Sequence, residues 1–132
     1  MKIAICPGSY DPVTYGHLDI IKRSAVLVDK LIVTVFVNPS KKASLFSIEE
    51  RLDMLRETTK DIPNVEVDTS TGLLNVYAAS KNCHLIIRGL RAFSDFEYEF
   101  QRALMIKKID PTLETAFFMT DGRYSYLSSD RK

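Results

Sequence analysis

Hydrophobic residues recur along the chain in two alternating patterns. Short runs rich in β-branched residues predict strands, and longer segments with apolar residues at three- and four-residue steps predict helices. The strand-like runs are residues 2–6, 30–37, 64–68, 84–88 and 114–120. Because a helical segment follows each of the first four runs, the pattern predicts a parallel sheet with crossover helices.

Helices are expected in the four gaps between these strands. The first begins near Gly16, and its apolar residues would form one buried stripe. The residues of that stripe are Leu18, Ile21, Ala25 and Val28. The second helix begins at Ser47, which can form a capping box with Glu50, and the third covers residues 73–81.

The fourth helix is expected to open with a second capping box, formed by Ser94 and Glu97. Phe96, Phe100 and Ala103 follow at helical spacing, and aromatic residues at this spacing usually belong to a core. We therefore expect these three side chains to face inward.

The order of the elements predicts the fold class. Right-handed crossovers on a parallel five-stranded sheet give a doubly wound, Rossmann-like α/β fold, a three-layer α/β/α sandwich. In such sheets ligands bind beyond the carboxyl ends of the strands, where the strand order reverses. The ends of the first and fourth strands are therefore the expected place for chemistry.

Composition narrows the class of protein. A chain of 132 residues with 45% hydrophobic content is the size of one domain. A net charge of +1 argues against binding to nucleic acid or to a membrane surface. Cys6 and Cys83 lack metal-site spacing and are expected to be small buried apolar residues. The absence of a leader sequence and of a long apolar run predicts a cytoplasmic protein. The protein is also expected to have no metal site of its own.

The loop after the first strand has the residue types of a phosphate site. Residues 7–17 read PGSYDPVTYGH and lead directly into a helix, whose N-terminal N–H groups and dipole attract anions. The loop contains neither a dinucleotide-binding fingerprint nor a P-loop. On these grounds alone, an ordinary loop with a structural histidine is an equally good interpretation.

Two motifs give the chain a specific resemblance. PGSYDPVTYGH resembles the [PG]-[ST]-F-D-P-x-T-x-G-H signature of bacterial phosphopantetheine adenylyltransferases, with Tyr10 in place of the usual Phe. RGLRAFSDFEYE, at residues 88–99, is similar to that family's RGLRxxxDFEYE. The similarity extends from Met1 to about Ser129. It implies a single nucleotidyltransferase domain over residues 1–132.

The resemblance implies a reaction and its partners. Family members join the adenylyl group of ATP to 4'-phosphopantetheine and release pyrophosphate and dephospho-coenzyme A. The resemblance also implies Mg²⁺ with ATP, inhibition by coenzyme A and assembly into homohexamers. No activated Ser or Cys nucleophile is needed, because the substrate phosphate itself attacks the α-phosphorus.

The resemblance also implies roles for individual residues. His17, Lys41 and Arg91 would be catalytic, and His17 would stabilise charge on the α-phosphate. The implied ATP contacts are Ser9, Tyr10, His17, Gly89, Leu90, Arg91, Glu99, Tyr124, Ser125, Tyr126, Leu127, Ser128 and Ser129. The implied contacts to phosphopantetheine are Ser9, Lys41, Leu74 and Arg88.

Structural interpretations of the same residues remain open beside these roles. Ser9 can be a turn residue, Lys41 a solvated loop charge and Leu74 a core residue. Glu99 can be a solvent-exposed helix carboxylate.

The end of the chain departs from the family pattern. The family continues into a further helix, whereas this sequence has Asp130 in place of a third serine and ends at Lys132, so C-terminal helices are expected to be missing. One alternative is therefore a nucleotide-binding form with impaired catalysis. Another is a different adenylyl- or cytidylyltransferase of the superfamily, such as a nicotinamide mononucleotide adenylyltransferase. A tRNA synthetase fragment is disfavoured by the near-zero net charge and the lack of a KMSKS-like stretch.

Overall fold

The structure is a computed structural model that describes residues 1–37, 44–90 and 93–120, without the side chains of residues 93–95. Strands and helices alternate along it, as the sequence predicted. The elements are β1 (Ile3–Gly8), α1 (Tyr15–Ala25), β2 (Lys30–Val37), α2 (Ile48–Thr59), β3 (Val65–Thr71), α3 (Leu74–Ser80), β4 (Leu85–Leu90), α4 (Phe93–Ile109) and β5 (Glu114–Met119).

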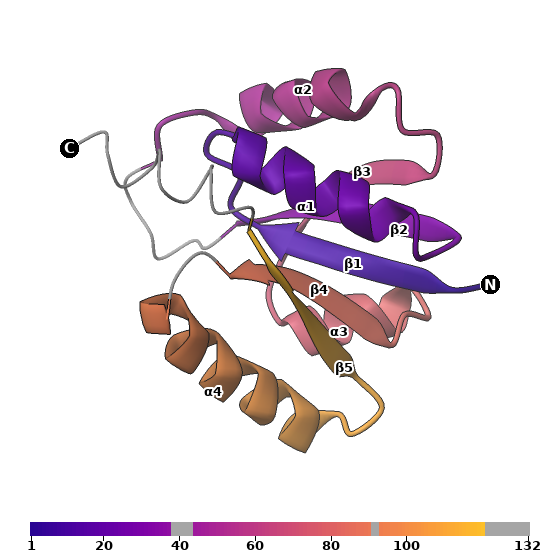
Figure 1. Cartoon of the computed structure of the whole chain (residues 1–132), viewed down its shortest axis with the longest axis vertical. Helices are drawn as coiled ribbons and strands as arrows, with labels where there is room; N and C mark the ends of the chain where they lie inside the picture. The colour runs from indigo at the N-terminus through magenta and orange to yellow at the C-terminus, as the bar shows by residue number, and fades with distance from the viewer. Residues whose placement is uncertain (38–43, 91–92, 121–132) are drawn as a thin grey trace.

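All five strands form one parallel sheet in the order β3-β2-β1-β4-β5 (Figure 1). The chain first builds outward from β1 through β2 to β3, and then crosses back to place β4 on the other side of β1. The strand order therefore reverses between β1 and β4, which confirms the doubly wound topology. The expected ligand position, at the carboxyl ends of these two strands, follows from it.

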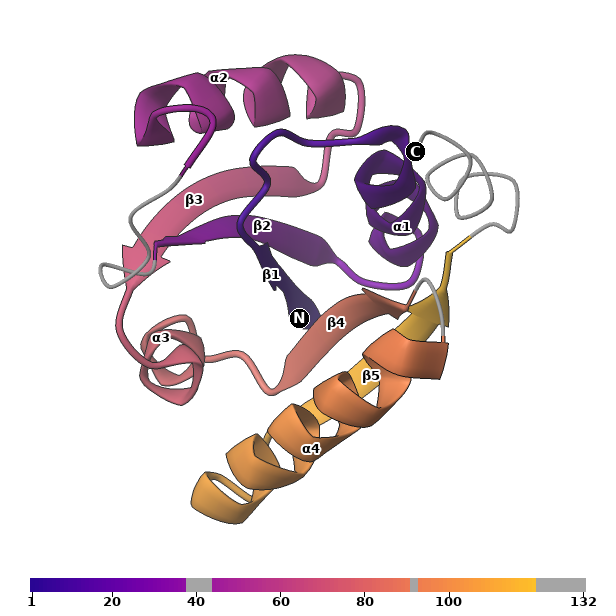
Figure 2. The same cartoon turned by 90° about the vertical axis from the view of Figure 1, so that its left-hand side faces the viewer.

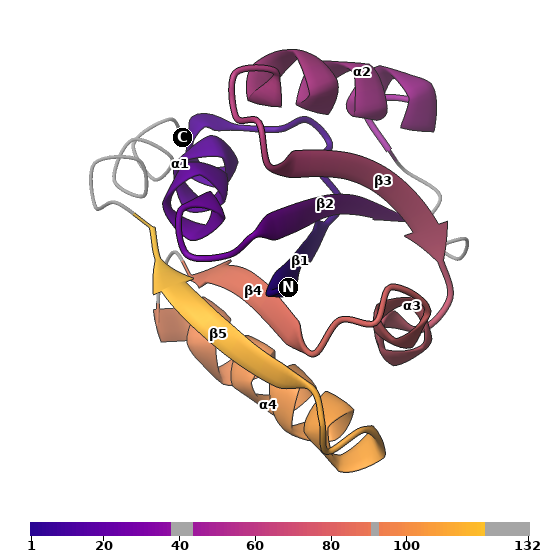
Figure 3. The same ribbon diagram turned by 90° about the vertical axis from the view of Figure 1, so that its right-hand side faces the viewer.

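Two core clusters, one on each face of the sheet, make the three layers. Helices α1 and α2 cover one face, where Ile21 and Leu55 are fully buried against Val33. Helices α3 and α4 cover the other face, where Tyr77 and Ile106 pack against strand residues. Figure 2 and Figure 3 show the two pairs of helices on opposite sides of the sheet. Because side chains alternate along a strand, neighbouring residues of β1 point into different clusters.

Most local predictions for the helices are confirmed. Ser47 caps α2 with its side chain, and Glu50 returns a hydrogen bond to the Ser47 backbone, which completes the predicted capping box. In α1, Ile21 and Ala25 are buried and Leu18 is half-buried, whereas Val28, the last residue of the predicted stripe, is half-buried but lies beyond the end of the helix at Ala25. Cys6 and Cys83 are buried free thiols, as expected for small apolar residues, and burial raises the pKa of both.

The prediction for the start of α4 was wrong. The helix begins at Phe93, so Ser94 lies inside its first turn and cannot be the residue that caps it. Strands β1, β3 and β4 also end later than expected. β1 continues to Gly8 and β4 to Leu90, which places the start of both motifs on the sheet itself.

The inward orientation expected for Phe96 and Phe100 was also wrong. Their side chains are 42% and 41% exposed, and Ala103 is half-buried. Phe96 stacks on Phe100 with ring centroids 5.5 Å apart and meets Phe117 of β5 edge-on. The reason is that α4 lies along the β4–β5 side of the sheet (Figure 2), and among the described residues β5 is the edge strand, so the sheet covers only part of this helix. In the described part of the chain, no helix is long and apolar enough to cross a membrane.

Candidate active site

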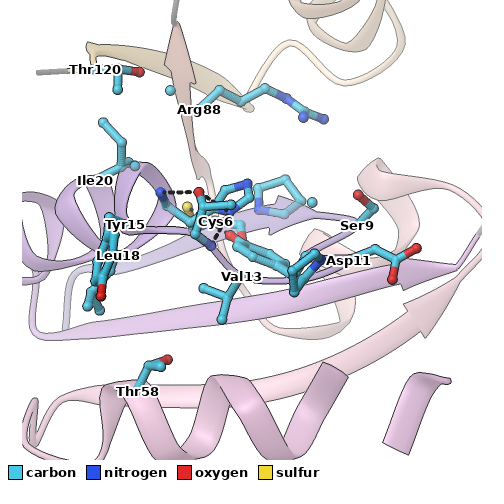
Figure 4. Close-up of a pocket in the computed structure, with 18 of the residues that line it drawn as sticks. Cys6, Ser9, Asp11, Val13, Tyr15, Leu18, Ile20, Thr58, Arg88 and Thr120 are labelled. Carbon is cyan, nitrogen blue, oxygen red and sulfur yellow. Dashed lines mark hydrogen bonds between the residues drawn. The ribbon is translucent and has the colours of Figure 1, made fainter. Parts of the chain in front are cut away.

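A cleft of about 1070 Å³ opens at the carboxyl ends of β1 and β4. One wall is the loop that follows β1 together with the first turns of α1, and the other carries Arg88, Gly89 and Glu99. Figure 4 shows Ser9 and Asp11 of the loop on one side and Arg88 on the other. The fold thus brings the two sequence motifs, about 80 residues apart, to one cavity.

His17 occupies the third position of α1, where a helix leaves N–H groups without intrahelical partners. Thr14 is the N-cap residue, and its hydroxyl accepts a hydrogen bond from the His17 N–H at 3.2 Å. In return, the Thr14 N–H donates to Nδ1 of His17 at 3.0 Å. Since Nδ1 accepts, a neutral His17 ring carries its proton on Nε2. The capping box therefore fixes both the orientation and the tautomer of the imidazole.

The side chain of Tyr10 packs against the imidazole ring of His17. Its ring is 2% exposed, and its centroid is 4.9 Å from that of His17. Its hydroxyl donates to the carbonyl oxygen of Cys6 at 2.9 Å, so the polar end of the side chain is directed into the protein. Burial, followed by the neighbouring Cys6, raises the pKa of the Tyr10 phenol well above its usual value. The ring also explains Gly8, where a Cβ atom would come within 3.1 Å of it.

Helix α2 and the residues just before it hold the loop, through contacts of two residues that the sequence analysis did not select, Asp11 of the loop and Arg51 of the helix. The carboxylate of Asp11 accepts hydrogen bonds from the N–H groups of Leu45 and Phe46, both at 2.8 Å. Arg51, which is 7% exposed, donates from Nη1 to the carbonyl oxygen of Ser9 at 3.1 Å. Asp11 lies in the first motif and could have been selected on that basis, whereas nothing in the sequence around Arg51 indicates this contact.

Arg88 follows the buried residues Ile86 and Ile87 in β4 and lies close to a carboxylate. Its Nε atom is 3.4 Å from Oε1 of Glu99, and the two side chains are only 13% and 18% exposed. Arg102 approaches the other oxygen of Glu99 at 3.7 Å. Burial, followed by the charge of Arg102, lowers the pKa of Arg88, and Glu99 opposes this effect.

The contact between Arg88 and Glu99 leaves hydrogen-bonding capacity unused. Among the described residues, no acceptor takes a hydrogen bond from Arg88, and Oε1 of Glu99 is buried without a donor. The Arg88 guanidinium is therefore partly neutralised, but its donors remain available to an anion in the cleft. Glu99 is not the exposed helix carboxylate that was the alternative interpretation.

The remaining predicted residues divide into three groups. Gly89 lines the cleft, and a Cβ atom there would lie 3.0 Å from Ile20, so this glycine lets α1 approach β4. Leu90 is 5% exposed, and Leu74 packs against the core on the other face, so neither lines the described cleft. The rest lie outside the described residues: Lys41, Arg91, Tyr124, Ser125, Tyr126, Leu127, Ser128 and Ser129.

The described residues do not fit a metal site formed by the protein alone. Within residues 1–37, 44–90 and 93–120, no group of three His, Cys, Asp or Glu side chains could hold an ion. Asp11 accepts backbone N–H groups, Glu57 pairs with Lys60, and Glu99 lies between two arginines, so each of the three carboxylates that line the cleft already has a cationic or N–H neighbour.

Solved structures with low sequence identity share the fold. A lipopolysaccharide core biosynthesis protein from Thermoplasma volcanium superposes with a TM-score of 0.64 at 20% identity, covering 92% of this chain and 97% of that protein. A bifunctional NMN adenylyltransferase/ADP ribose pyrophosphatase from Francisella tularensis gives a TM-score of 0.64 at 15% identity, covering 99% of this chain and 42% of that one.

Sequence comparisons are more specific. Residues 5–131 match the family model described as cytidylyltransferase-like. The phosphopantetheine adenylyltransferase of Caldanaerobacter subterraneus subsp. tengcongensis is 63% identical over 98% of this chain and 80% of its own length. That of Clostridium tetani is 57% identical over the same shares. With both motifs lining one cleft at the switch point of the sheet, the chain belongs to the phosphopantetheine adenylyltransferase family, within the cytidylyltransferase-like nucleotidyltransferases.

Proposed function

We propose that this protein transfers the adenylyl group of ATP to 4'-phosphopantetheine, forming dephospho-coenzyme A and pyrophosphate in coenzyme A biosynthesis. The relatives that are 56–63% identical over 98% of the chain carry the name of this activity. The structural observation that supports it best is the single cleft that both His17 and Arg88 line. The phosphate of the acceptor and the phosphates of the nucleotide each need cationic or N–H groups, and the two walls supply one set each.

The reaction needs positioning more than covalent chemistry. An oxygen of the 4'-phosphate attacks the α-phosphorus of ATP in line, the bond to the β-phosphate oxygen breaks, and pyrophosphate leaves. Holding two reactants in this geometry can supply about 7 to 11 kcal/mol of the barrier. The protein therefore has to align two anions and stabilise the charge that develops between them.

His17 is suited to stabilising that charge. Its Nδ1 atom accepts from the Thr14 N–H, so Nε2 is the donor of the neutral ring. We assign this donor to an oxygen of the α-phosphate, where charge grows during the attack. The N-terminus of α1, in whose first turn His17 lies, adds the positive end of the helix dipole.

Arg88 is suited to holding the 4'-phosphate. A planar guanidinium can bind two phosphate oxygens at once, and Glu99 keeps this one oriented without using its donors. Ser9 and Gly89 line the same cleft and complete the proposed contacts among the described residues. We extend the proposal to Lys41, Arg91 and residues 124–129 on the family motifs alone. Mg²⁺ would enter bound to ATP phosphates and balance their charge.

The test is a coupled pyrophosphate assay on the full chain with ATP and 4'-phosphopantetheine. We expect pyrophosphate release with this pair, and little when CTP replaces ATP or nicotinamide mononucleotide replaces the acceptor. Release only with one of the substitutes would assign the chain to another nucleotidyltransferase activity. ATP binding in calorimetry without any turnover would leave a binding protein and refute the proposed reaction.

His17→Ala tests the role of the histidine. We expect turnover to fall on the order of 10²-fold with a modest loss of ATP affinity, as for a lost transition-state donor. His84→Ala is the matched control, because the second histidine precedes β4 at the opposite end of the sheet and contacts Thr112. Near-normal turnover of His17→Ala would refute the assignment.

A further inference from the structure

Arg51 places a buried positive charge behind the loop that lines the cleft. It lies in the first turn of α2, and its guanidinium reaches two carbonyl oxygens, that of Ser9 at 3.1 Å and that of Ser47 at 3.4 Å. Within the described residues Arg51 forms no ion pair, and its hydrogen bonds go to backbone carbonyl oxygens. Burying an unpaired guanidinium is costly, and a simple packing role would be met by an apolar side chain.

The contact determines which way one peptide group faces. The carbonyl oxygen of Ser9 is turned toward Arg51 and therefore toward α2. The C=O and N–H of a trans peptide point in opposite directions, so the N–H of Tyr10 is turned away from α2. Figure 4 places Arg88 on that side of the loop, opposite the helix that carries Thr58. The loop thus directs a donor rather than an acceptor toward the part of the cleft where anions are proposed to bind.

The backbone of Tyr10 shows that this orientation is not the relaxed one. Its φ of 47° lies in the left-handed region, which residues other than glycine rarely adopt. A half-turn of the peptide between Ser9 and Tyr10 would bring that φ into the ordinary negative range. The same half-turn would point the Ser9 carbonyl oxygen toward the anions. Strained residues persist only where their surroundings hold them.

We propose that Arg51 is a positioning residue for adenylyl transfer: by binding the Ser9 carbonyl oxygen, it keeps the 9–10 peptide turned so that the carbonyl faces away from the phosphates. Asp11 supports the same loop by binding the two N–H groups that precede Ser47. This inference rests on the proposed function for its kinetic consequence, but its structural consequence is independent of any substrate.

The test compares Arg51→Met, Arg51→Lys and a control on the same helix. Leu55→Val is the control, because Leu55 is fully buried in the α2 core and is not among the residues lining the cleft. It lowers the stability of α2 without touching the Ser9 carbonyl. Thermal unfolding establishes that all variants are folded at the assay temperature, and ATP titration by calorimetry gives the concentration of competent sites.

We expect Arg51→Met to lower kcat per competent site on the order of 10- to 100-fold, with a smaller change in KM, because misplaced reactants lose mainly transition-state alignment. Arg51→Lys, which retains one donor for the Ser9 oxygen, should recover part of that loss, and Leu55→Val should keep the wild-type kcat. In a crystal structure of Arg51→Met, the φ of Tyr10 should be negative.

Two results would overturn the proposal. One is a Tyr10 that keeps its positive φ in Arg51→Met, and the other is a kcat for that variant equal to that of Leu55→Val. Failure of the proposed function gives a different result, namely wild-type protein that releases no pyrophosphate. In that case the φ of Tyr10 in the variant still decides whether Arg51 orients the loop.

Discussion

Tyr10→Phe separates the two contributions that this side chain can make to the site. The substitution removes only the hydroxyl, which donates to the Cys6 carbonyl oxygen at 2.9 Å and lies 3.4 Å from its sulfur. Loss of one buried hydrogen bond should lower the free energy of unfolding by about 0.5 to 1.5 kcal/mol. For a chain of this size that corresponds to a decrease in Tm of roughly 2 to 5 °C. The ring stays in contact with His17, so kcat should remain within about twofold of wild type.

The pH dependence adds a second check on the same variant. Burial, followed by Cys6, raises the folded-state pKa of Tyr10 above the usual value of 10.0. The neutral phenol is therefore favoured in the folded state, and its contribution to stability is fully present below pH 10. That contribution is lost as the pH rises from 10 toward the folded-state pKa. The Tm difference between wild type and Tyr10→Phe should be constant at neutral pH and should shrink above pH 10.

Thermal unfolding and steady-state kinetics on the same preparations decide whether the Tyr10 hydroxyl stabilises the fold or contacts a substrate. A tenfold or larger loss of kcat in Tyr10→Phe, with Tm almost unchanged, would mean that the hydroxyl contacts a substrate and that its bond to Cys6 is not its role. Tyr10→Leu is the complementary variant, because it removes the ring as well and should lower kcat through loss of support for His17.

Two further substitutions test the opposite wall of the cleft. Gly89→Ala adds a Cβ atom 3.0 Å from Ile20 and should lower the free energy of unfolding by about 1 to 3 kcal/mol. Gly16→Ala is the control, because its Cβ atom would meet nothing closer than 3.6 Å and should not lower stability. Equal Tm values for the two variants would contradict the close approach of α1 to β4. Arg88→Lys keeps the charge beside Glu99 but loses the planar fork. It should lower kcat/KM for 4'-phosphopantetheine about 10- to 100-fold and affect ATP less, and an equal effect on both substrates would argue against the assigned phosphate contact.

The fold could be predicted because its signals are local and repeated. Each strand and helix has its own hydrophobic period, and the right-handed crossover rule then leaves few topologies. The rule that ligands bind where the strand order reverses placed both motifs at the carboxyl edge of the sheet before any contact was known. The observed reversal lies between β1 and β4. The orientation of Phe96 and Phe100 could not be predicted in the same way. Helical spacing shows that a face is apolar, but it does not show whether the sheet extends far enough to cover that face.

The parts of the site that could not be predicted depend on contacts between residues distant in sequence. Arg51 donates a hydrogen bond to the carbonyl oxygen of Ser9, which lies 42 positions earlier in the chain. Because the acceptor is a backbone atom, the pattern of side chains does not indicate this contact. The sequence shows Tyr10 only as an aromatic residue in a loop. In the structure its backbone is left-handed, and its ring points inward and packs against His17. The motif selected candidate residues, but it did not separate those that face the cleft from those that support the loop.

Those supporting contacts explain how a loop can serve a reaction that depends on alignment. Residues 9–11 are held by Arg51 at one carbonyl, by the Tyr10 hydroxyl on Cys6 and by the Asp11 carboxylate on two N–H groups. The first two bonds run to α2 and to β1, and the Asp11 bonds run to residues 45 and 46 just before α2, so the sheet and α2 together hold the loop in place. Catalysis by positioning is lost when the reactants move by about 1 Å. An enzyme whose loop lacked these supports could therefore still bind ATP, but it would transfer the adenylyl group of ATP slowly.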